Sequence, residues 1–298
     1  NQLPAPNYDG FPLGMYLSPE PVLPVQFSRG CYYKDCAFCA LTLDHQNFRQ
    51  RDPGKTVDDL VWLKERYGAQ SFFFTDECFA LSPTKRLCQQ MIDRQVNVKW
   101  TCELRFEKNL TRELLGQMRD AGCLKIVFGL ESFNQRVMDF MKKGIKQESV
   151  RRIVDDCVDL GIAVHCYVIV GFPTEKEEEA LDTMNFVVGN KKLHESYGFS
   201  CQPCLFDLEK EAPIMSDPGS YGIRRIMRPA TEDLSLGFFY EVQEGMTPAQ
   251  AEQLYQQVYE KISEVVCELP FNYSMADGLL YIARAKSQAL QVPQPTGS

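Results

Sequence analysis

The sequence predicts an α/β fold, arranged as a partial (β/α)6, TIM-like barrel. Three observations support this fold class. Short β-rich runs alternate with helical patterns, the alternation repeats about every 25–35 residues, and six such units fit between residues 22 and 206. A complete eight-unit barrel takes about 250 residues, so an open barrel fits this span better. A doubly wound open sheet is the alternative, and both arrangements place the functional site at the carboxyl ends of the strands.

Six runs rich in β-branched and aromatic residues are expected to form the strands. Each is short and apolar, as buried parallel strands are. In chain order they lie at 22–28, 70–75, 98–105, 124–130, 162–170 and 197–206. The last run contains Cys201 and Cys204, which are either core residues or a second metal or redox pair.

The helical patterns between these strands begin at recognisable capping residues. Ser and Thr side chains accept a hydrogen bond from the backbone of the first helical turn, and Pro in that turn strengthens the signal. Thr174 and Glu177 have the spacing of a capping box. The predicted caps are Thr56, Ser82, Thr111, Thr174 and Thr247, the last of which opens a helix near 248–266.

Four regions are expected along the chain. Residues 1–20 form an extended, proline-rich lead-in or linker, and residues 21–206 form the partial barrel. Residues 207–290 form an α-rich C-terminal extension that closes the open side of the barrel and shapes the substrate site. Residues 291–298 are expected to be a disordered tail. Because the chain begins with Asn rather than Met, we expect the natural N-terminus to be missing, and whether a whole domain precedes it stays open.

Composition narrows the classes of partner. The 298 residues include 32 Lys and Arg and 40 Asp and Glu, a net charge of −8, and no polybasic run stands out. Nucleic acid is therefore not the expected partner. The sequence has neither a signal-peptide pattern nor an apolar run of about 20 residues, so a cytoplasmic protein without a membrane span is expected. Twelve cysteines are the unusual feature, because a core of this size needs no disulfides.

Three of these cysteines are closely spaced directly after the first predicted strand. Cys31, Cys36 and Cys39 form a C-x4-C-x2-C pattern. Three converging thiolates can hold one metal centre, and a [4Fe–4S] cluster held by three cysteines leaves one iron open to a ligand. A structural zinc ion needs four protein ligands, and His45 would supply the fourth. Both metal centres remain open on the spacing alone.

The loop Arg29-Gly-Cys-Tyr-x-x-x-Cys-x-Phe-Cys39 resembles the cluster motif of the radical S-adenosylmethionine (SAM) superfamily. The most frequent family signature is C-x3-C-x2-C, so this chain departs from it by one residue in the first gap. The form of the loop is similar to that of a subgroup with many cobalamin-dependent members. The resemblance extends over about residues 20–206, where it implies a partial barrel of the radical SAM type.

Other stretches resemble the family in the same order, each at the end of a predicted strand. They are Phe74–Glu77, Thr101–Arg105, Phe128–Ser132 and Val168–Glu175. The resemblance implies that Cys31, Cys36 and Cys39 hold the cluster. It further implies SAM contacts from Phe38, Asp76, Glu77, Glu103, Arg105, Glu131, Ser132, Ile169 and Gly171.

The chemistry of SAM matches these residue types, because its ammonium, carboxylate and sulfonium groups need acidic acceptors beside a cation. Strand alternation places Thr101, Glu103 and Arg105 on one face, which we expect to line the barrel interior. His165 and Tyr167 share a face of the fifth predicted strand. They either line the substrate cavity or, for the histidine, form a hydrogen-bonded part of the core.

The resemblance implies an enzyme that reductively cleaves SAM to a 5′-deoxyadenosyl radical. The expected outcome is methylation, alkylation or rearrangement of a natural-product, small-molecule or peptide substrate, with methyl or alkyl transfer favoured and a flavodoxin- or ferredoxin-type electron donor. The chain lacks an Asp-x-His-x-x-Gly pattern, so any cobalamin would be bound by a domain absent from it. The alternatives are an RNA-modifying radical SAM enzyme and a non-enzymatic zinc-binding protein using Cys31, Cys36, Cys39 and His45. The sequence singles out no hydrogen-atom donor.

Overall fold

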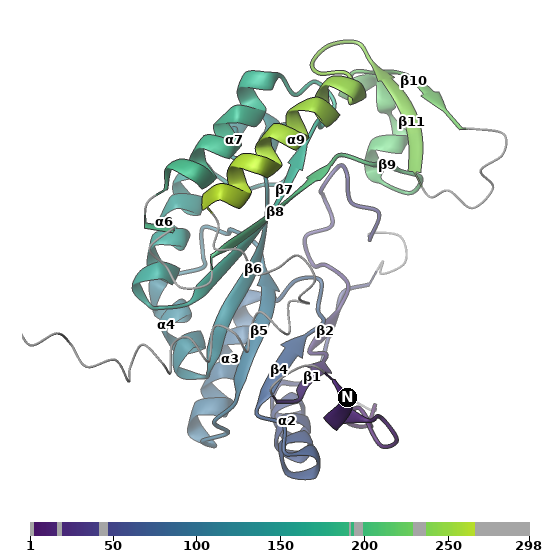
Figure 1. Cartoon of the computed structure of the whole chain (residues 1–298). Coiled ribbons are helices and arrows are strands. Elements are labelled where there is room, and N and C mark those ends of the chain that lie inside the picture. Colours follow the sequence, from purple (N-terminus) through teal and green to yellow (C-terminus); the bar gives the residue numbers. More distant parts are fainter. Residues whose placement is uncertain are drawn as a thin grey trace, which may run out of the picture.

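A computed structural model describes residues 3–16, 20–41, 47–190, 192–193, 199–228 and 237–265. Its centre is a six-stranded parallel sheet (Figure 1). The strands are β1 (Val22–Val25), β4 (Ser71–Phe74), β5 (Lys99–Leu104), β6 (Cys123–Glu131), β7 (Ala163–Val170) and β8 (Ser200–Leu205). All six predicted strands are present, each shorter or longer than expected by a few residues.

The strand order decides between the two predicted arrangements. The order is β1-β4-β5-β6-β7-β8, so each new strand joins the same edge of the sheet. A doubly wound sheet reverses direction once, and this sheet does not. Right-handed crossovers in constant order bring all connecting helices to one face. In the described part of the chain β1 and β8 are the two edges, so the predicted partial, open barrel is confirmed.

The helices cover the outer face of the sheet (Figure 1). They are α2 (Pro53–Tyr67), α3 (Leu81–Asp93), α4 (Arg112–Asp120), α5 (Gln135–Phe140), α6 (Gln147–Asp159) and α7 (Glu177–Gly189). On β5, Trp100, Cys102 and Leu104 are buried in the core beneath these helices. Thr101 and Glu103 face the opposite, inner side, as strand alternation predicts.

The C-terminal part combines a small sheet with one long helix. Strands β9 (Leu208–Glu209), β10 (Ile223–Met227) and β11 (Gly237–Val242) form an antiparallel sheet in the order β10-β11-β9. An α-rich extension was expected, so this sheet corrects the prediction for residues 207–242. The short helical turns η2 (Pro213–Ser216) and η3 (Pro218–Tyr221) lie between its strands.

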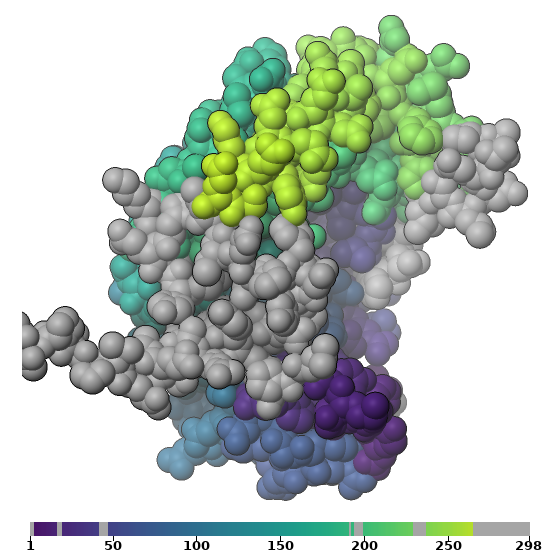
Figure 2. All heavy atoms as spheres, in the orientation of Figure 1, coloured from purple at the N-terminus to yellow at the C-terminus, as the bar shows by residue number. Residues whose placement is uncertain are grey.

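Helix α9 (Pro248–Val265) belongs to the main core. Ala251, Leu254, Val258 and Ile262 join the cluster beneath the other outer helices, and α9 contacts α7, β7 and β8. It therefore occupies the place of the helix of the sixth βα unit. Figure 2 shows α9 beside the small sheet on one face of the molecule. The expected boundary at residue 206 and the closing role of residues 207–290 remain predictions, since residues 266–298 lie outside the described part.

Two of the predicted helix caps are confirmed. The Thr111 hydroxyl accepts a hydrogen bond from Leu114 N at 3.3 Å, at the start of α4. Before α9, Thr247 Oγ1 accepts from Gln250 N at 3.3 Å, and Gln250 Oε1 accepts from Thr247 N at 2.9 Å. This reciprocal pair satisfies two backbone donors that a helix start otherwise leaves unpaired.

Three predicted caps are wrong by a few residues. Helix α2 begins earlier, with Asp52 accepting from Lys55 N at 3.0 Å, so Thr56 lies inside it. Helix α3 begins at Leu81 without a side-chain cap, and Ser82 is helical. At α7, Glu179 accepts from the backbone N–H of Lys176 at 2.9 Å, in place of the predicted box opened by Thr174.

The remaining described elements are short. They are the turn η1 (Leu13–Met15) and the antiparallel pair β2 (Ser28–Arg29) and β3 (Arg49–Gln50). No described helix is long and apolar enough to cross a membrane. His45, one ligand of the alternative zinc site, lies outside the described residues.

Candidate cofactor site

The cysteine loop leaves the sheet at the carboxyl end of β1 and β2 and rises toward the small sheet (Figure 1). Its centre is fixed by Ala37, which is completely buried. Ala37 N donates to Met141 O at 2.9 Å, and Ala37 O accepts from Ile214 N at 2.8 Å. The loop is thus held between the end of α5 and η2. These contacts explain how a segment without regular structure keeps a defined position.

The three cysteines of the loop differ in environment. Cys36 is buried, whereas Cys31 and Cys39 are half-buried. A hydrogen bond with the Cys78 thiol, together with bonds from Tyr33 and Lys34 N–H, lowers the pKa of Cys31 to about 5. Burial raises the pKa of Cys36, which the charges of Lys143 and Arg105 partly offset, and burial raises the pKa of Cys39 to about 11.

The donor chemistry fits an iron–sulfur cluster, because three thiols lie within electrostatic reach of one another beside two cations. The charges of Cys36 and Cys31 both act on Cys39. Within the described ranges, which include all three cysteines, no three or more His, Cys, Asp or Glu side chains converge closely enough to hold a metal ion, so the fit concerns the type of donor and not its arrangement.

Arg105 links the end of β5 to the cysteine loop. Its guanidinium lies 3.4 Å from the ring centroid of Tyr33, and its Nη1 lies 3.7 Å from Cys36 Sγ. Nη2 donates to the backbone carbonyl of Lys143. The sequence predicted that Arg105 would face this side, and the structure brings it into contact with a cluster cysteine.

Lys143 is the second cation, and sequence reasoning missed it. Its buried ammonium lies 3.0 Å from Glu131 Oε1 and 5.6 Å from the ring centroid of Phe38. The turn that carries it also includes Gly144, whose positive φ of 66° and missing Cβ let the Tyr33 hydroxyl approach. A β-carbon at that position would lie 2.2 Å from Tyr33 Oη.

Glu131 reaches this pair through a distortion of β6. The pairing of β6 with β7 shifts between Gly129 and Glu131, and Glu131 has a φ of 62°. Such a bulge re-aims a side chain at the end of a strand. A β-carbon on Gly129 would lie 2.6 Å from Glu131 Oε1, so glycine leaves the room for the ion pair.

The other acidic residues divide into two groups. Glu77 accepts from Gly30 N at 3.0 Å, so it contacts the turn before Cys31. Burial, then the charges of Glu131, Glu77 and Asp76, raises the pKa of Glu103 to about 7. Asp76 accepts from Phe27 N at 2.9 Å and from the N–H and hydroxyl of Ser28. Asp76 therefore pins β4 to the end of β1, and both of its oxygens are occupied by the chain.

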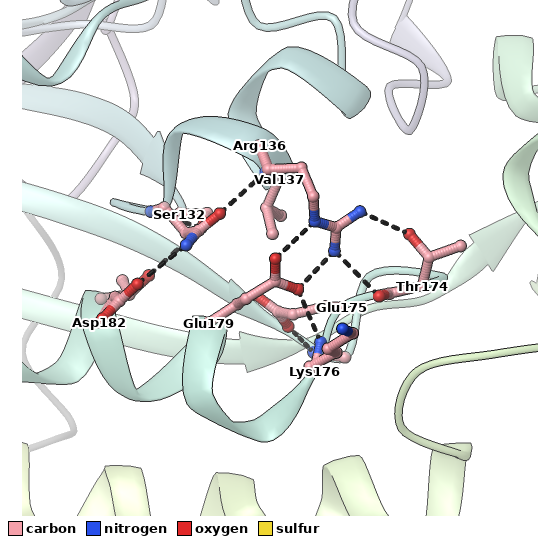
Figure 3. A network of polar contacts seen from close by, with 11 residues as sticks. Ser132, Arg136, Val137, Thr174, Glu175, Lys176, Glu179 and Asp182 are labelled. Carbon is pink, nitrogen blue, oxygen red and sulfur yellow. Dashed lines mark hydrogen bonds and ion pairs between the residues drawn. The ribbon is translucent and has the colours of Figure 1, made fainter.

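The turn after β7 is held by a network around Arg136 (Figure 3). The Arg136 guanidinium pairs with Glu179 and donates to Thr174 O at 2.9 Å. Thr174 has a φ of 71°, an unfavourable value for a β-branched residue that this network maintains. Glu175 Oε2 accepts from Gly171 N at 2.7 Å.

Ser132, Ile169 and Gly171 contact other parts of the fold and not the charged side chains of Arg105, Lys143 and Glu131. Ser132 is completely buried, and its Oγ lies 3.3 Å from Thr183 Oγ1. Ile169 packs in the second apolar cluster with Ala37. Gly171 approaches α9 so closely that a β-carbon on it would lie 2.4 Å from Ala251 Cβ.

The site therefore gathers five of the predicted SAM-binding residues near the loop. They are Phe38, Glu77, Glu103, Arg105 and Glu131. Cys201 and Cys204 point to opposite faces of β8, which argues against the alternative of a second metal or redox pair. Sequence reasoning missed Lys143 and Tyr33. Both lie outside the strands and helices, so no hydrophobic periodicity indicates which way their side chains point.

Residues 25–187 match the model of the radical SAM superfamily, which is more than half of the chain. The chain therefore belongs to the radical SAM superfamily. Membership implies a [4Fe–4S] cluster and SAM as cofactors.

Two curated relatives match the chain over about two thirds of its length or more. The chain is 28% identical over 201 residues to an uncharacterized methyltransferase of Pyrococcus horikoshii, covering 66% of this chain and 43% of that protein. It is 29% identical over 234 residues to an anaerobic magnesium-protoporphyrin IX monomethyl ester cyclase of Cereibacter sphaeroides, covering 75% of this chain and 37% of that protein. The chain thus spans less than half the length of these relatives.

The fold resembles that of the radical SAM methyltransferase TsrM from Kitasatospora setae, solved with cobalamin and a [4Fe–4S] cluster bound. The TM-score is 0.62 at 16% identity, over 92% of this chain and 62% of that one. A likeness at this identity concerns the fold.

Proposed function

We propose that this chain is the catalytic barrel of an enzyme that cleaves SAM reductively and uses it to transfer a methyl or alkyl group to a small-molecule or peptide substrate. The observation that carries the proposal is the cysteine loop, with Arg105 and Lys143 beside its buried Cys36. A cluster there would be held by Cys31, Cys36 and Cys39, and it supplies the electron that breaks the sulfonium bond of SAM.

In this proposal the residues of the chain bind the cluster and orient SAM. Arg105 and Lys143 offset the negative charge of the thiolates, which favours the metal-binding form of Cys36. Glu77 and Glu103 provide acceptors for the ammonium group of SAM, and Phe38 walls the loop from water. The apolar cluster around Ile169 and Phe172 keeps water from the carboxyl ends of the last strands, which a carbon radical requires.

Methyl or alkyl transfer is the favoured outcome, for two reasons. The Pyrococcus relative is named a methyltransferase, and TsrM, whose fold this chain resembles, is a methyltransferase. Cobalamin, if used, would bind outside the described residues, in a domain that this chain does not include. A flavodoxin- or ferredoxin-type protein is the proposed electron donor.

A cysteine comparison tests the proposal. The chain is reconstituted anaerobically with iron and sulfide, and iron content and 5′-deoxyadenosine formed with SAM and dithionite are measured. We expect about four irons per wild-type chain, and loss of both iron and product in Cys36→Ala. The control is Cys88→Ala, a completely buried cysteine beneath the outer helices, which should retain both. Stoichiometric zinc without iron, or unchanged SAM cleavage in Cys36→Ala, would refute the proposal.

A further inference from the structure

A second polar cluster lies on the inner face of the barrel, far from the cysteine loop. Lys125 is six residues before Glu131 on β6, roughly 18 Å along the strand toward its amino end. Its side chain crosses β7, where its register partner is the small Ala163, and donates to Ser200 Oγ on β8 at 3.2 Å. It therefore projects into the barrel, opposite the core residue Ile126.

Among the described residues, the buried ammonium group of Lys125 has no counter-ion. Lys125 is 3% exposed, and among the described side chains no carboxylate lies within ion-pair distance of it. A buried cation without an anion is unfavourable in a folded protein. Burial accordingly lowers the pKa of Lys125 to about 8.

His165 adds a buried ring nitrogen that can donate a hydrogen bond. Its Nδ1 lies 2.7 Å from Ser200 Oγ, the atom to which Lys125 donates. The serine oxygen can accept from both Lys125 and Nδ1–H, or its hydroxyl can donate to Nδ1, so an acceptor at Nε2 selects the tautomer that carries the histidine proton on Nε2. His165 Nε2 is buried and has no hydrogen-bond partner in the part of the chain that the structure describes. Burial, with the charge of Lys125, lowers the pKa of His165 to about 3, so the ring is neutral.

Thr101 completes the cluster from β5. It is paired in register with Lys125, it is completely buried, and its hydroxyl has no hydrogen-bond partner among the described residues. Three neighbouring strands therefore present an ammonium, an imidazole nitrogen and a hydroxyl on one face. Buried polar groups are almost always satisfied in folded proteins, so an unsatisfied set indicates a missing ligand or water.

We propose that Lys125, His165 and Thr101 bind a carboxylate group of the substrate inside the barrel. Lys125 is the counter-ion, and His165 Nε2 and the Thr101 hydroxyl donate to the carboxylate oxygens. A carboxylate carries one negative charge, which balances the single cation, whereas a phosphate dianion would leave an excess charge in a buried site. The inference rests on the proposed function, and it adds that the substrate has a carboxylate remote from its reacting carbon.

Acetate is the probe for this site. Thermal unfolding of the full chain is followed as sodium acetate replaces sodium chloride at constant ionic strength. We expect a saturable rise in Tm for the wild type. In Lys125→Met the acetate concentration for half-maximal effect should be at least about tenfold higher, because a charge-assisted bond is lost. Lys99→Met on β5, where the half-buried lysine pairs with Glu20 at 3.1 Å, is the matched control and should respond like the wild type.

Baseline stability gives a second readout. Without acetate, Lys125→Met should have a Tm equal to or above that of the wild type, because the substitution removes an uncompensated buried charge. A wild-type Tm that acetate does not change beyond chloride would mean that water alone satisfies the cluster, and it would overturn the proposal. So would an equal acetate response in Lys125→Met, or a response to inorganic phosphate but not to acetate. SAM cleavage by the wild-type chain is measured separately, so failure of the proposed function is distinguishable from failure of this site.

Discussion

Lys143 and Glu131 form a buried ion pair that places a positive charge beside the cluster cysteines. Their side chains are 6% and 10% exposed, and the ammonium and carboxylate lie 3.0 Å apart. A buried ion pair adds little to the net free energy of folding, because both charges lose their hydration. Its main effect here is to fix the position of the Lys143 ammonium beside the cysteines. Removal of one partner is a different matter, because the other charge is left buried alone.

The first prediction concerns this pair. Lys143→Met should lower the free energy of unfolding by about 3–5 kcal/mol, measured by urea denaturation of the chain without iron. Lys146→Met is the control, because Lys146 pairs with Asp139 at 2.9 Å in an exposed position. It should cost at most about 0.5 kcal/mol. A cost in Lys143→Met no larger than in the control would contradict the buried pair.

The second prediction concerns His165 and pH. An unfolded histidine binds a proton near pH 6.5, whereas His165 in the folded chain stays neutral down to about pH 3. The stability that neutral His165 contributes is therefore present above pH 6.5 and is lost as the pH falls toward 3. Between pH 7 and pH 5 the wild type should lose about 2 kcal/mol more than His165→Gln, measured by urea denaturation at each pH. Equal losses would show that His165 titrates normally.

At the level of single residues, the sequence predicted the side-chain direction of residues that lie on strands or directly after them. Glu103 and Arg105 follow from alternation on β5, because a strand places every second side chain on the same face. Lys143 had no such signal, since it lies in a turn between Lys142 and Gly144, both with positive φ. Asp76 was expected near SAM, but a carboxylate that pins two backbone N–H groups has the same sequence pattern as one that binds a ligand.

Gly171 connects two elements, because the turn after β7 meets helix α9 there. Its φ of 87° disfavours any side chain, and a β-carbon would also lie 2.4 Å from Ala251 Cβ. The close approach lets α9 pack as the sixth helix of the barrel. The same turn is held on its other side by Arg136 and Glu179 (Figure 3).

The third prediction separates these two effects. Gly171→Ala should lower the Tm, with a cost of about 1–3 kcal/mol for the backbone strain plus the clash with α9. Adding Ala251→Gly should remove the clash and restore that part of the stability, but the cost of the backbone strain should remain. Gly116→Ala in α4 is the control, because it has open space and helical φ, and it should be neutral or stabilising by up to about 1 kcal/mol. A Gly171→Ala chain as stable as the wild type would contradict the contact.

Strands and helices with a clear hydrophobic pattern were predictable. Helix starts with two candidate capping residues, and very short strands, were not. All six barrel strands follow from their apolar runs. The Thr56 cap was wrong because Asp52, followed by Pro53, is a stronger helix start four residues earlier. The small sheet was missed because β9 has two residues and β10 carries Arg224 and Arg225, so its strands resemble solvated loops.

At the scale of the whole molecule, one open barrel supports two polar sites at different depths. The cysteine loop lies at the carboxyl ends of the strands, and the Lys125 cluster lies toward their amino ends. The length of the βα region predicted an open barrel over a closed one. The strand order that excludes a doubly wound sheet was established by the structure. The packing of α9 as the sixth helix was not predictable, because an insertion of about 40 residues with its own sheet separates it from β8.

Electron paramagnetic resonance of the reconstituted, dithionite-reduced chain tests the central claim most directly. A cluster held by Cys31, Cys36 and Cys39 keeps one iron open, so the proposed function requires SAM to bind that iron. We predict a reduced-cluster signal whose g values shift when SAM is added. A signal that saturating SAM leaves unchanged, or no cluster signal after reconstitution, would contradict the account.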